Sequence, residues 1–435
     1  MLLESTRHQS PPVTFREALV RGLAPDGGLY LPTRLPRIDP AQLDSWRGLP
    51  LAGVATRLAE RLLDDEFPRE VIRELVGDAF SFPAPTVTVE DGFAILELFH
   101  GPTLAFKDFG ARFLARFFGY LLLERHDRAT ILVATSGDTG SAVASGFHGV
   151  PNVRVVLLYP RGRVSPFQEA QMATVGGNVR ALNVPGTFDD CQRLVKTAFL
   201  DETLAGLRLS SANSINIGRL LPQSFYYIAS YLSVTRAADD GVVFSVPSGN
   251  LGNLTAGVIA QRMGLPVRRF IAASNVNDVL PSFLSNGEYR ARSAVRTLSN
   301  AMDVGDPSNF PRLFALHGGS LTAMRENLTG IAIDDQRTRE TIRDLHARTG
   351  YLLDPHGAVG YAAAREFAGT TRANVPVVTL ATAHPAKFGD AIAEALGFSP
   401  PLPAGHQDWA ERPIVAVELR DTEYASFRAY LVSEA

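Results

Sequence analysis

The feature that most constrains the fold is an alternation, from residue 86 onward, of short apolar segments, polar or glycine-rich loops and amphipathic segments. Five such units have the apolar segments FAILELF, ILVAT, VRVVLLYP, VVFSVP and PVVTLAT. The alternation is typical of α/β proteins in which helices cover both faces of a parallel sheet. Ligands bind beyond the carboxyl ends of the strands in such sheets, so we expect the functional residues in the loops that follow these segments.

Residues 1–80 have a different pattern, with apolar residues at helical spacing in LAGVATRLAERLLDDEF and REVIRELVGDAF. A PAP turn at Pro83 to Pro85 separates this region from the alternating part. These features predict a mostly helical N-terminal extension.

The composition limits the partners of the chain. Its 435 residues carry 42 Lys and Arg against 45 Asp and Glu, a formal net charge of −3, whereas a nucleic-acid binder usually has a basic surplus. The single cysteine, Cys191, cannot form an internal disulfide, which indicates a reducing compartment. No apolar run approaches the roughly 18 residues of a membrane span, and the N-terminus has no signal-peptide pattern. We therefore predict a cytoplasmic protein that binds neither nucleic acid nor membrane.

Lysine is rare in this chain. Only Lys107, Lys196 and Lys387 are lysines among the 42 basic residues, and the other 39 are arginines. Arginine serves for ion pairs and solvation, but it stays protonated and cannot form an imine with an aldehyde. Each lysine is therefore a candidate functional group, although each one alone could equally be a remainder of codon bias.

Two of these lysines follow predicted strands. In HGPTLAFKDFG, Lys107 lies at the start of a helix between two phenylalanines, where the helix terminus and desolvation lower the proton affinity of an amine. The alternative is a solvated lysine beside a helix-capping Asp108. In LATAHPAKFGD, Thr382 and Lys387 follow a strand, and a hydroxyl there can hydrogen-bond a pyridine nitrogen without protonating it.

Two glycine-rich loops link a strand to a helix, an arrangement whose free N–H groups and helix dipole favour an anion. Glycines needed only for a tight turn would explain the first loop equally well, and Asp138 in the second could instead cap its helix. The loop in VPSGNLGNLTAG predicts a phosphate-binding cup formed by Ser248, Gly249, Asn250, Leu251, Gly252 and Asn253. The loop in VATSGDTGSAVA predicts a second anion site formed by Ser136, Gly137, Asp138 and Thr139.

Two more segments are rich in polar residues and could bind a second phosphate, because arginine binds phosphate through paired hydrogen bonds. Each could equally be a helix cap with surface arginines. We predict no metal site, because His384 has no second ligand at metal-binding spacing. The candidate residues are Arg161 and Arg163 in YPRGRVSPFQ, and Ser211, Asn213, Ser214 and Asn216 in SSANSINIGRL.

A lysine for an imine, a glycine cup for a phosphate and a hydroxyl for a pyridine nitrogen together point to pyridoxal 5'-phosphate as cofactor. The chain also closely resembles the threonine synthases of the bacterial and fungal type. The resemblance rests on seven motifs in order: HGPTLAFKDFG, ATSGDTGSAV, YPRGRVSPFQ, SANSIN, VPSGNLGNLTAG, SNAMDV and TAHPAKF. The N-terminal segment TFREALVRGLAPDGGLYLP is similar to the start of that family, so the resemblance covers almost the whole chain.

The resemblance implies an α/β fold of pyridoxal-phosphate fold type II, which is the tryptophan synthase β-like fold. It implies a lyase that converts O-phospho-L-homoserine and water to L-threonine and phosphate, the last step of threonine biosynthesis. In such enzymes γ-elimination of phosphate is followed by β-addition of water.

The resemblance also implies roles for individual residues. Lys107 is similar to the Schiff-base lysine of the family, and Thr382 to the residue that meets the pyridine nitrogen. The SGDTG loop resembles the segment that contacts the amino-acid end of the substrate. Two departures concern fit and not reaction class: Leu251 stands where Phe is common, and Ala381 where Gly is common. The residues similar to the cofactor-phosphate loop are Gly249, Asn250, Leu251 and Asn253.

The resemblance also favours a monomer. We further expect an N-terminal domain over residues 1–85 and a large cofactor-binding domain formed by 86–109 and 221–435. A smaller mobile α/β domain over 110–220 completes the prediction. The substrate phosphate could be bound by Arg161, Arg163, the 211–219 segment or Lys387. Two alternatives remain open: a phospholyase or dehydratase on the same scaffold that releases 2-oxobutyrate and ammonia, and a protein that binds the cofactor without catalysis.

Overall fold

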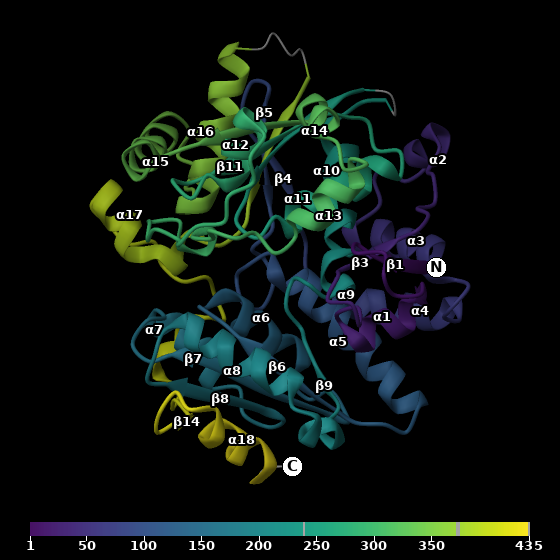
Figure 1. Cartoon of the computed structure of the whole chain (residues 1–435). Helices are drawn as coiled ribbons and strands as arrows, with labels where there is room; N and C mark the ends of the chain where they lie inside the picture. The colour runs from purple at the N-terminus through teal and green to yellow at the C-terminus, as the bar shows by residue number, and fades with distance from the viewer. Residues whose placement is uncertain (238–239, 371–374, 434–435) are drawn as a thin grey trace.

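The computed structural model describes residues 1–237, 240–370 and 375–433. They form three sheets, each with its own helices (Figure 1). In Figure 1 the elements of the six-stranded sheet lie above those of the five-stranded sheet, and the N-terminal elements lie to one side. No helix in these ranges combines the length and the apolar character that a membrane span requires.

The N-terminal region has the two helices that its apolar spacing predicts, α3 and α4, and in addition a small antiparallel sheet of order β2-β1-β3 that was not predicted. Its elements are β1 (Leu2–Ser5), β2 (Val13–Thr14), α1 (Phe15–Arg21), β3 (Tyr30–Pro32), α2 (Pro40–Asp44), α3 (Leu51–Leu63) and α4 (Arg69–Ala79).

The six-stranded sheet has the order β12-β11-β10-β13-β5-β4 and is parallel except for β4, which runs antiparallel to β5. Every residue of β10 and β13 is buried, because helices cover both faces, and this explains their continuous apolar sequences. The strands are β4 (Thr86–Glu90), β5 (Phe93–Glu97), β10 (Val242–Pro247), β11 (Val267–Ser274), β12 (Leu328–Ala332) and β13 (Val377–Ala381). The helices that accompany them are α10 (Gln223–Val234), α11 (Gly252–Arg262), α12 (Val279–Asn286), α13 (Phe310–Leu316), α14 (Leu321–Asn327), α15 (Asp335–Thr349), α16 (Pro355–Thr370) and α17 (Gly389–Leu396).

The five-stranded sheet is parallel throughout, with the order β14-β8-β7-β6-β9. Its strands are β6 (Ala129–Ala134), β7 (Val153–Pro160), β8 (Val179–Val184), β9 (Leu209–Ser210) and β14 (Ala416–Glu418). The helices of this part are α5 (Lys107–Glu124), α6 (Asp138–Phe147), α7 (Pro166–Ala173), α8 (Phe188–Leu200), α9 (Ile217–Leu220) and α18 (Tyr424–Ser433).

The C-terminal segment differs from the predicted division, which placed all of residues 221–435 in the large domain. β14 pairs with β8 of the smaller sheet, and α18 lies against α8. The physical reason is apolar burial: Phe427 and Leu431, one helical turn apart, are fully buried in a cluster that includes Leu194 of α8.

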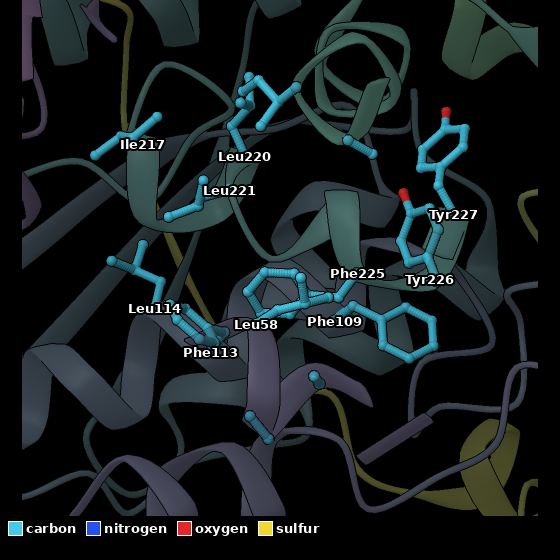
Figure 2. Packing of buried hydrophobic residues seen from close by; sticks show 14 of the residues in the cluster. Leu58, Phe109, Phe113, Leu114, Ile217, Leu220, Leu221, Phe225, Tyr226 and Tyr227 are labelled. Carbon is cyan, nitrogen blue, oxygen red and sulfur yellow. The ribbon is translucent and has the colours of Figure 1, made fainter. Parts of the chain in front are cut away.

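The helix that begins at Lys107 is anchored by a large aromatic core. Phe113 stacks on Phe117 at 4.4 Å between ring centroids, and its ring meets the edge of Phe225 on α10 at 6.1 Å. Figure 2 shows Phe109, Phe113 and Leu114 of α5 among residues of α3, α9 and α10. Close-packed aromatic rings leave little freedom for a helix to shift, so the N-terminus of α5 has a well-defined position.

Candidate functional site

Lys107 is brought to the carboxyl edge of the six-stranded sheet by two adjacent loops. It is the first residue of α5 and follows the loop that leaves β5. The backbone N–H of Phe106 donates to the carbonyl of Thr382 at 2.9 Å, and Ala105 pairs with Ala383 in an isolated bridge. The loops after β5 and β13 therefore lie side by side, which places Lys107, Thr382 and Lys387 in one region, as the sequence predicts.

A buried carboxylate joins two of the three lysines. Asp138 Oδ1 lies 2.8 Å from the Nζ of Lys387, and Asp138 Oδ2 lies 3.6 Å from the Nζ of Lys107. The Asp138 side chain is only 5% exposed. Asp138 is the first residue of α6, and no side chain caps that terminus. Its carboxylate therefore pairs with the lysines and does not cap the helix.

The ion pairs set the charge states of this cluster. Burial alone would raise the pKa of Asp138, but Lys387, Lys107 and a hydrogen bond from Gln168 outweigh burial and hold this pKa well below its usual range. Burial lowers the pKa of Lys107, the nearby cations Lys387 and Arg219 lower it further, and the negative charge of Asp138 opposes them. The site thus holds a firmly ionised carboxylate beside an amine that gives up its proton more readily than an ordinary lysine.

Asp108, the neighbour of Lys107, is not a solvated partner of that lysine. It is fully buried, and it accepts hydrogen bonds from the backbone N–H of Thr103 at 2.8 Å and from the Thr103 hydroxyl at 2.7 Å. Burial raises its pKa, and these hydrogen bonds oppose the shift. Asp108 therefore fixes the shape of the loop that presents Lys107.

The SGNLGN loop forms a cup between β10 and α11. Leu251 has a positive φ of 61°, and α11 begins at Gly252 without a side-chain cap, so the first N–H groups of the helix have no capping side chain. A Cβ on Gly249 would lie 3.0 Å from both Ala301 O and Met302 Cα, so a larger residue would have to displace these backbone atoms. A helix terminus of this kind suits a phosphate.

Asn253 supplies a further donor to the cup. Its Oδ1 accepts hydrogen bonds from the hydroxyls of Tyr226 at 2.7 Å and Tyr227 at 2.8 Å, two side chains that Figure 2 labels on α10. Its Nδ2 is buried and has no hydrogen-bond partner among the residues that the structure describes. A buried amide donor without a partner is costly, and an anion in the cup would satisfy it.

The remaining cup residues have structural partners as well. Asn250 Oδ1 accepts a hydrogen bond from the Ser308 hydroxyl at 3.2 Å, and the Ser248 hydroxyl donates to Val246 O at 2.8 Å. These bonds leave the backbone of the loop to form the anion site. Thr382 is 7% exposed, and within the described ranges its hydroxyl makes no hydrogen bond, so it is available to a ligand.

The second predicted anion loop, Ser136 to Thr139, follows β6 and is shaped by Gln168 and Thr135. Gly137 has a φ of 142°, and a Cβ there would lie 2.5 Å from the Gln168 side chain. The Thr135 hydroxyl accepts hydrogen bonds from the N–H groups of Gly137 and Gly140. Ser136 is exposed and Thr139 is half-buried.

The other predicted substrate residues fall into two groups. Ser214 lies near the cup, with its hydroxyl 3.4 Å from that of Ser308. Asn213 Oδ1 is buried and has no partner among the described residues, while the Ser211 hydroxyl accepts from the Asn213 N–H. Asn216 caps α9 and donates to two backbone carbonyls, so its side chain is fully used.

Arg161 and Arg163 are not joined to the lysine cluster by any contact among the described residues. Arg161 donates to Asn183 Oδ1 at 2.9 Å and pairs with Glu418 of β14, while Arg163 is exposed. Their predicted role in binding a phosphate therefore stays a prediction. No cluster of His, Cys, Asp and Glu in the described ranges could hold a metal ion.

Several supporting residues escaped the sequence analysis. Tyr226 and Tyr227 lie in an apolar run that resembles an ordinary core helix, so no local signal marked them. Asp354 and His356 were detectable in DPHG ahead of a helix: His356 Nδ1 lies 2.5 Å from Asp354 Oδ2, and its Nε2 accepts from the N–H of Ala301 at 3.1 Å. This pair braces the loop that forms the wall of the cup.

The site as a whole fits a phosphorylated aldehyde with a ring nitrogen. Lys107 offers an amine, the cup with the unpartnered Asn253 amide offers donors for a phosphate, and Thr382 offers a hydroxyl. These three groups follow β5, β10 and β13, which are neighbours in the sheet.

Comparisons with known proteins agree with this description. A family model for pyridoxal-phosphate dependent enzymes matches residues 83–383, and models for the threonine synthase N terminus and C-terminal region match 3–80 and 357–430. The threonine synthase of Haemophilus influenzae is 43% identical, over 99% of this chain and 100% of the relative.

Solved structures give the same result. The chain is similar to the PLP-bound threonine synthase of Brucella melitensis, with a TM-score of 0.95 and 40% identity over 99% of this chain and 98% of that one. It is also similar to the yeast threonine synthase, with a TM-score of 0.92 and 34% identity over 100% and 98%. A threonine deaminase of Solanum lycopersicum, at 17% identity and a TM-score of 0.57 over 76% and 89%, shares the fold alone.

The lysine cluster generates a direct prediction. Asp138→Asn should lower the pKa of Lys107 further, because the charge of Asp138 is the interaction that raises it. Since the chain has only three lysines, NMR of protein labelled at the lysine Cε carbons resolves the titration of each in the ligand-free state. Asp189→Asn, at an exposed position of α8, is the matched control. A Lys107 titration that is unchanged or moves to higher pH in Asp138→Asn would contradict the ion pair.

Proposed function

The chain belongs to the threonine synthase family, and from that membership we propose the roles of its site residues, beginning with Lys107 as the residue that bonds the cofactor. The enzyme is a pyridoxal-phosphate-dependent lyase that converts O-phospho-L-homoserine and water to L-threonine and phosphate. The observation that carries the role of Lys107 is the position of its largely buried amine at the carboxyl edge of the sheet, in reach of a carboxylate that can balance its charge.

When bound, pyridoxal 5'-phosphate supplies an electron sink that stabilises negative charge on the carbons of the substrate. The SGNLGN cup, from Ser248 to Asn253, would hold its phosphate through backbone N–H groups and the Asn253 amide. Thr382 would donate its hydroxyl to the pyridine nitrogen, and a neutral hydroxyl leaves that nitrogen unprotonated.

We assign proton transfer to Lys107. Its lowered pKa increases the share of neutral amine near neutral pH, and a neutral amine can take the proton from the α-carbon of the substrate. Asp138 then stabilises the ammonium that forms, which keeps the proton at a defined place until it is returned. Ser136, Gly137 and Thr139 lie in the same loop as Asp138 and would contact the amino-acid end of the substrate.

The remaining proposals concern the compartment, the oligomeric state and the movement of the smaller lobe. The substrate is a small molecule, and we propose that the enzyme acts as a cytoplasmic monomer without nucleic acid. The net charge of −3 and the lone, buried Cys191 support the compartment and the absence of nucleic acid, and the family resemblance favours the monomer. We also propose that the lobe around the five-stranded sheet moves over the site to control water.

Lys107→Ala should remove the visible absorption band of the lysine-bound cofactor and lower the rate of threonine formation by at least about 10³-fold, since no other group replaces the amine. The matched control is Lys196→Ala, at an exposed position of α8, which should keep both the band and the rate. Absorbance spectra and a threonine assay with O-phospho-L-homoserine check this. An unchanged band in Lys107→Ala would refute the assignment of this lysine.

Gly249→Val should weaken retention of pyridoxal 5'-phosphate, because the new side chain meets backbone atoms of Ala301 and Met302 at the wall of the cup. Overpacking of this kind costs about 1 to 3 kcal/mol, or roughly a 5- to 150-fold increase in the Kd for the cofactor. Equilibrium dialysis measures that Kd. Gly206→Val, where an added Cβ meets no atom within 4 Å, should bind as the unchanged protein does, and equal affinities of the two variants would rule out the cup.

A further inference from the structure

The ion pair between Lys387 and Asp138 connects the two larger sheets of the molecule. Lys387 lies in a short 3-10 turn (Pro385–Phe388) that follows β13 of the six-stranded sheet, whereas Asp138 follows β6 of the five-stranded sheet. Besides its contact with Asp138, the Lys387 ammonium donates to the carbonyl of Thr103 at 2.8 Å. Thr103 lies in the loop after β5. The Lys387 ammonium therefore joins the loops after β5 and β13, in the larger lobe around the six-stranded sheet, to the loop after β6, in the smaller lobe around the five-stranded sheet.

Helix α7, which neighbours α6, contacts Asp138 and also the carbonyl that accepts the hydrogen bond from Lys387. Gln168 Nε2 donates to Asp138 Oδ1 at 3.0 Å, and Gln171 Nε2 donates to Thr103 O at 3.1 Å. The Lys387 side chain is 0% exposed. The boundary between the lobes therefore holds a buried polar cluster, where opposite charges attract with little screening and where removal of one partner leaves the other charge unpaired.

Lysine suits position 387 better than arginine does, because few acceptors are available where the two lobes meet. Nearly every other cation in the chain is an arginine. A guanidinium has five N–H donors in a plane, and the two acceptors found here would leave three of them buried without partners. A compact ammonium with three donors matches the site.

We propose that the Lys387–Asp138 ion pair is a latch that holds the smaller lobe closed over Lys107, which makes Lys387 a positioning residue that limits the access of water. The latch rests on the proposed function of the site. Its Asp138 end is also the carboxylate that contacts Lys107, so closure and the placement of that carboxylate are one event.

The latch has a chemical consequence for the products. Threonine formation consumes one water for each phosphate released, and so does the side reaction that yields 2-oxobutyrate and ammonia from the same substrate. The two routes differ in where water attacks, since hydrolysis of the bond between nitrogen and carbon releases the keto acid. More frequent opening of the lobe should therefore raise the ratio of 2-oxobutyrate to threonine, while one water is still consumed for each phosphate released.

The test compares the holoenzymes of the unchanged protein, Lys387→Met and the control Lys196→Met. Without substrate, backbone hydrogen exchange in peptides that cover 138–147 and 166–173 should be at least about tenfold faster in Lys387→Met, because opening of the lobe becomes easier. Lys196→Met, which removes a lysine exposed on α8, should exchange as the unchanged protein does. With O-phospho-L-homoserine, Lys387→Met should also give a higher ratio of 2-oxobutyrate to threonine.

Unchanged exchange in Lys387→Met overturns the latch, whatever happens to activity. A higher KM with unchanged exchange and an unchanged product ratio would do the same and would assign Lys387 to the substrate phosphate. Lys387→Gln, which keeps a hydrogen-bond donor but no charge, gives the same test with the same expected direction if Lys387→Met does not fold. Because the exchange comparison uses no substrate, it decides on the latch even if the unchanged protein forms no threonine.

Discussion

The structure of the site depends on one buried carboxylate shared by two ammonium groups. Asp138 stays charged although its side chain is buried, because each of its carboxylate oxygens faces an ammonium group: Oδ1 faces that of Lys387 and Oδ2 faces that of Lys107. Removal of one partner from a buried pair commonly costs about 3 to 5 kcal/mol, because the other charge is left unpaired. This dependence explains why the loops after β5, β6 and β13 must meet at one point, and the sheet order and the aromatic anchor of α5 bring them there.

The same site contains donors that none of the described residues satisfies. The Asn253 amide is buried without a partner in the described ranges, and α11 begins without a side-chain cap. Tyr226 and Tyr227 hold the Asn253 side chain in place, and the His356–Asp354 pair holds the Ala301 loop that forms the wall of the cup. Polar groups arranged before a ligand arrives cost stability in the free protein, and an anionic cofactor recovers that cost on binding.

The parts of the fold that depend on local pattern were predictable from the sequence. The segments VRVVLLYP and VVFSVP coincide with β7 and β10, because strands buried on both faces read as continuous apolar runs. β11 was missed because two arginines, Arg268 and Arg269, interrupt its apolar run. The attachment of α18 to the smaller sheet was missed because it depends on contacts between segments far apart in the chain.

In the candidate site, too, local features were predictable from the sequence and contacts between distant segments were not. Lysine scarcity identified Lys107 and Lys387, and strand ends identified the loops that carry them and Asp138. The pairing of Asp138 with both lysines could not be predicted, because nothing local in the sequence encodes a distance between loops of two sheets. Arg161 was selected because its residue type suits phosphate, and the structure adds that its side chain contacts Asn183 and Glu418; its role in binding a phosphate stays a prediction.

The measurement that tests the account most directly is the product balance of the purified, cofactor-loaded enzyme with O-phospho-L-homoserine. Phosphate, threonine, 2-oxobutyrate and ammonia are followed together in one reaction. A site that keeps its lobes closed over Lys107 predicts equal amounts of phosphate and threonine. Phosphate accompanied by 2-oxobutyrate and ammonia in place of threonine would contradict it.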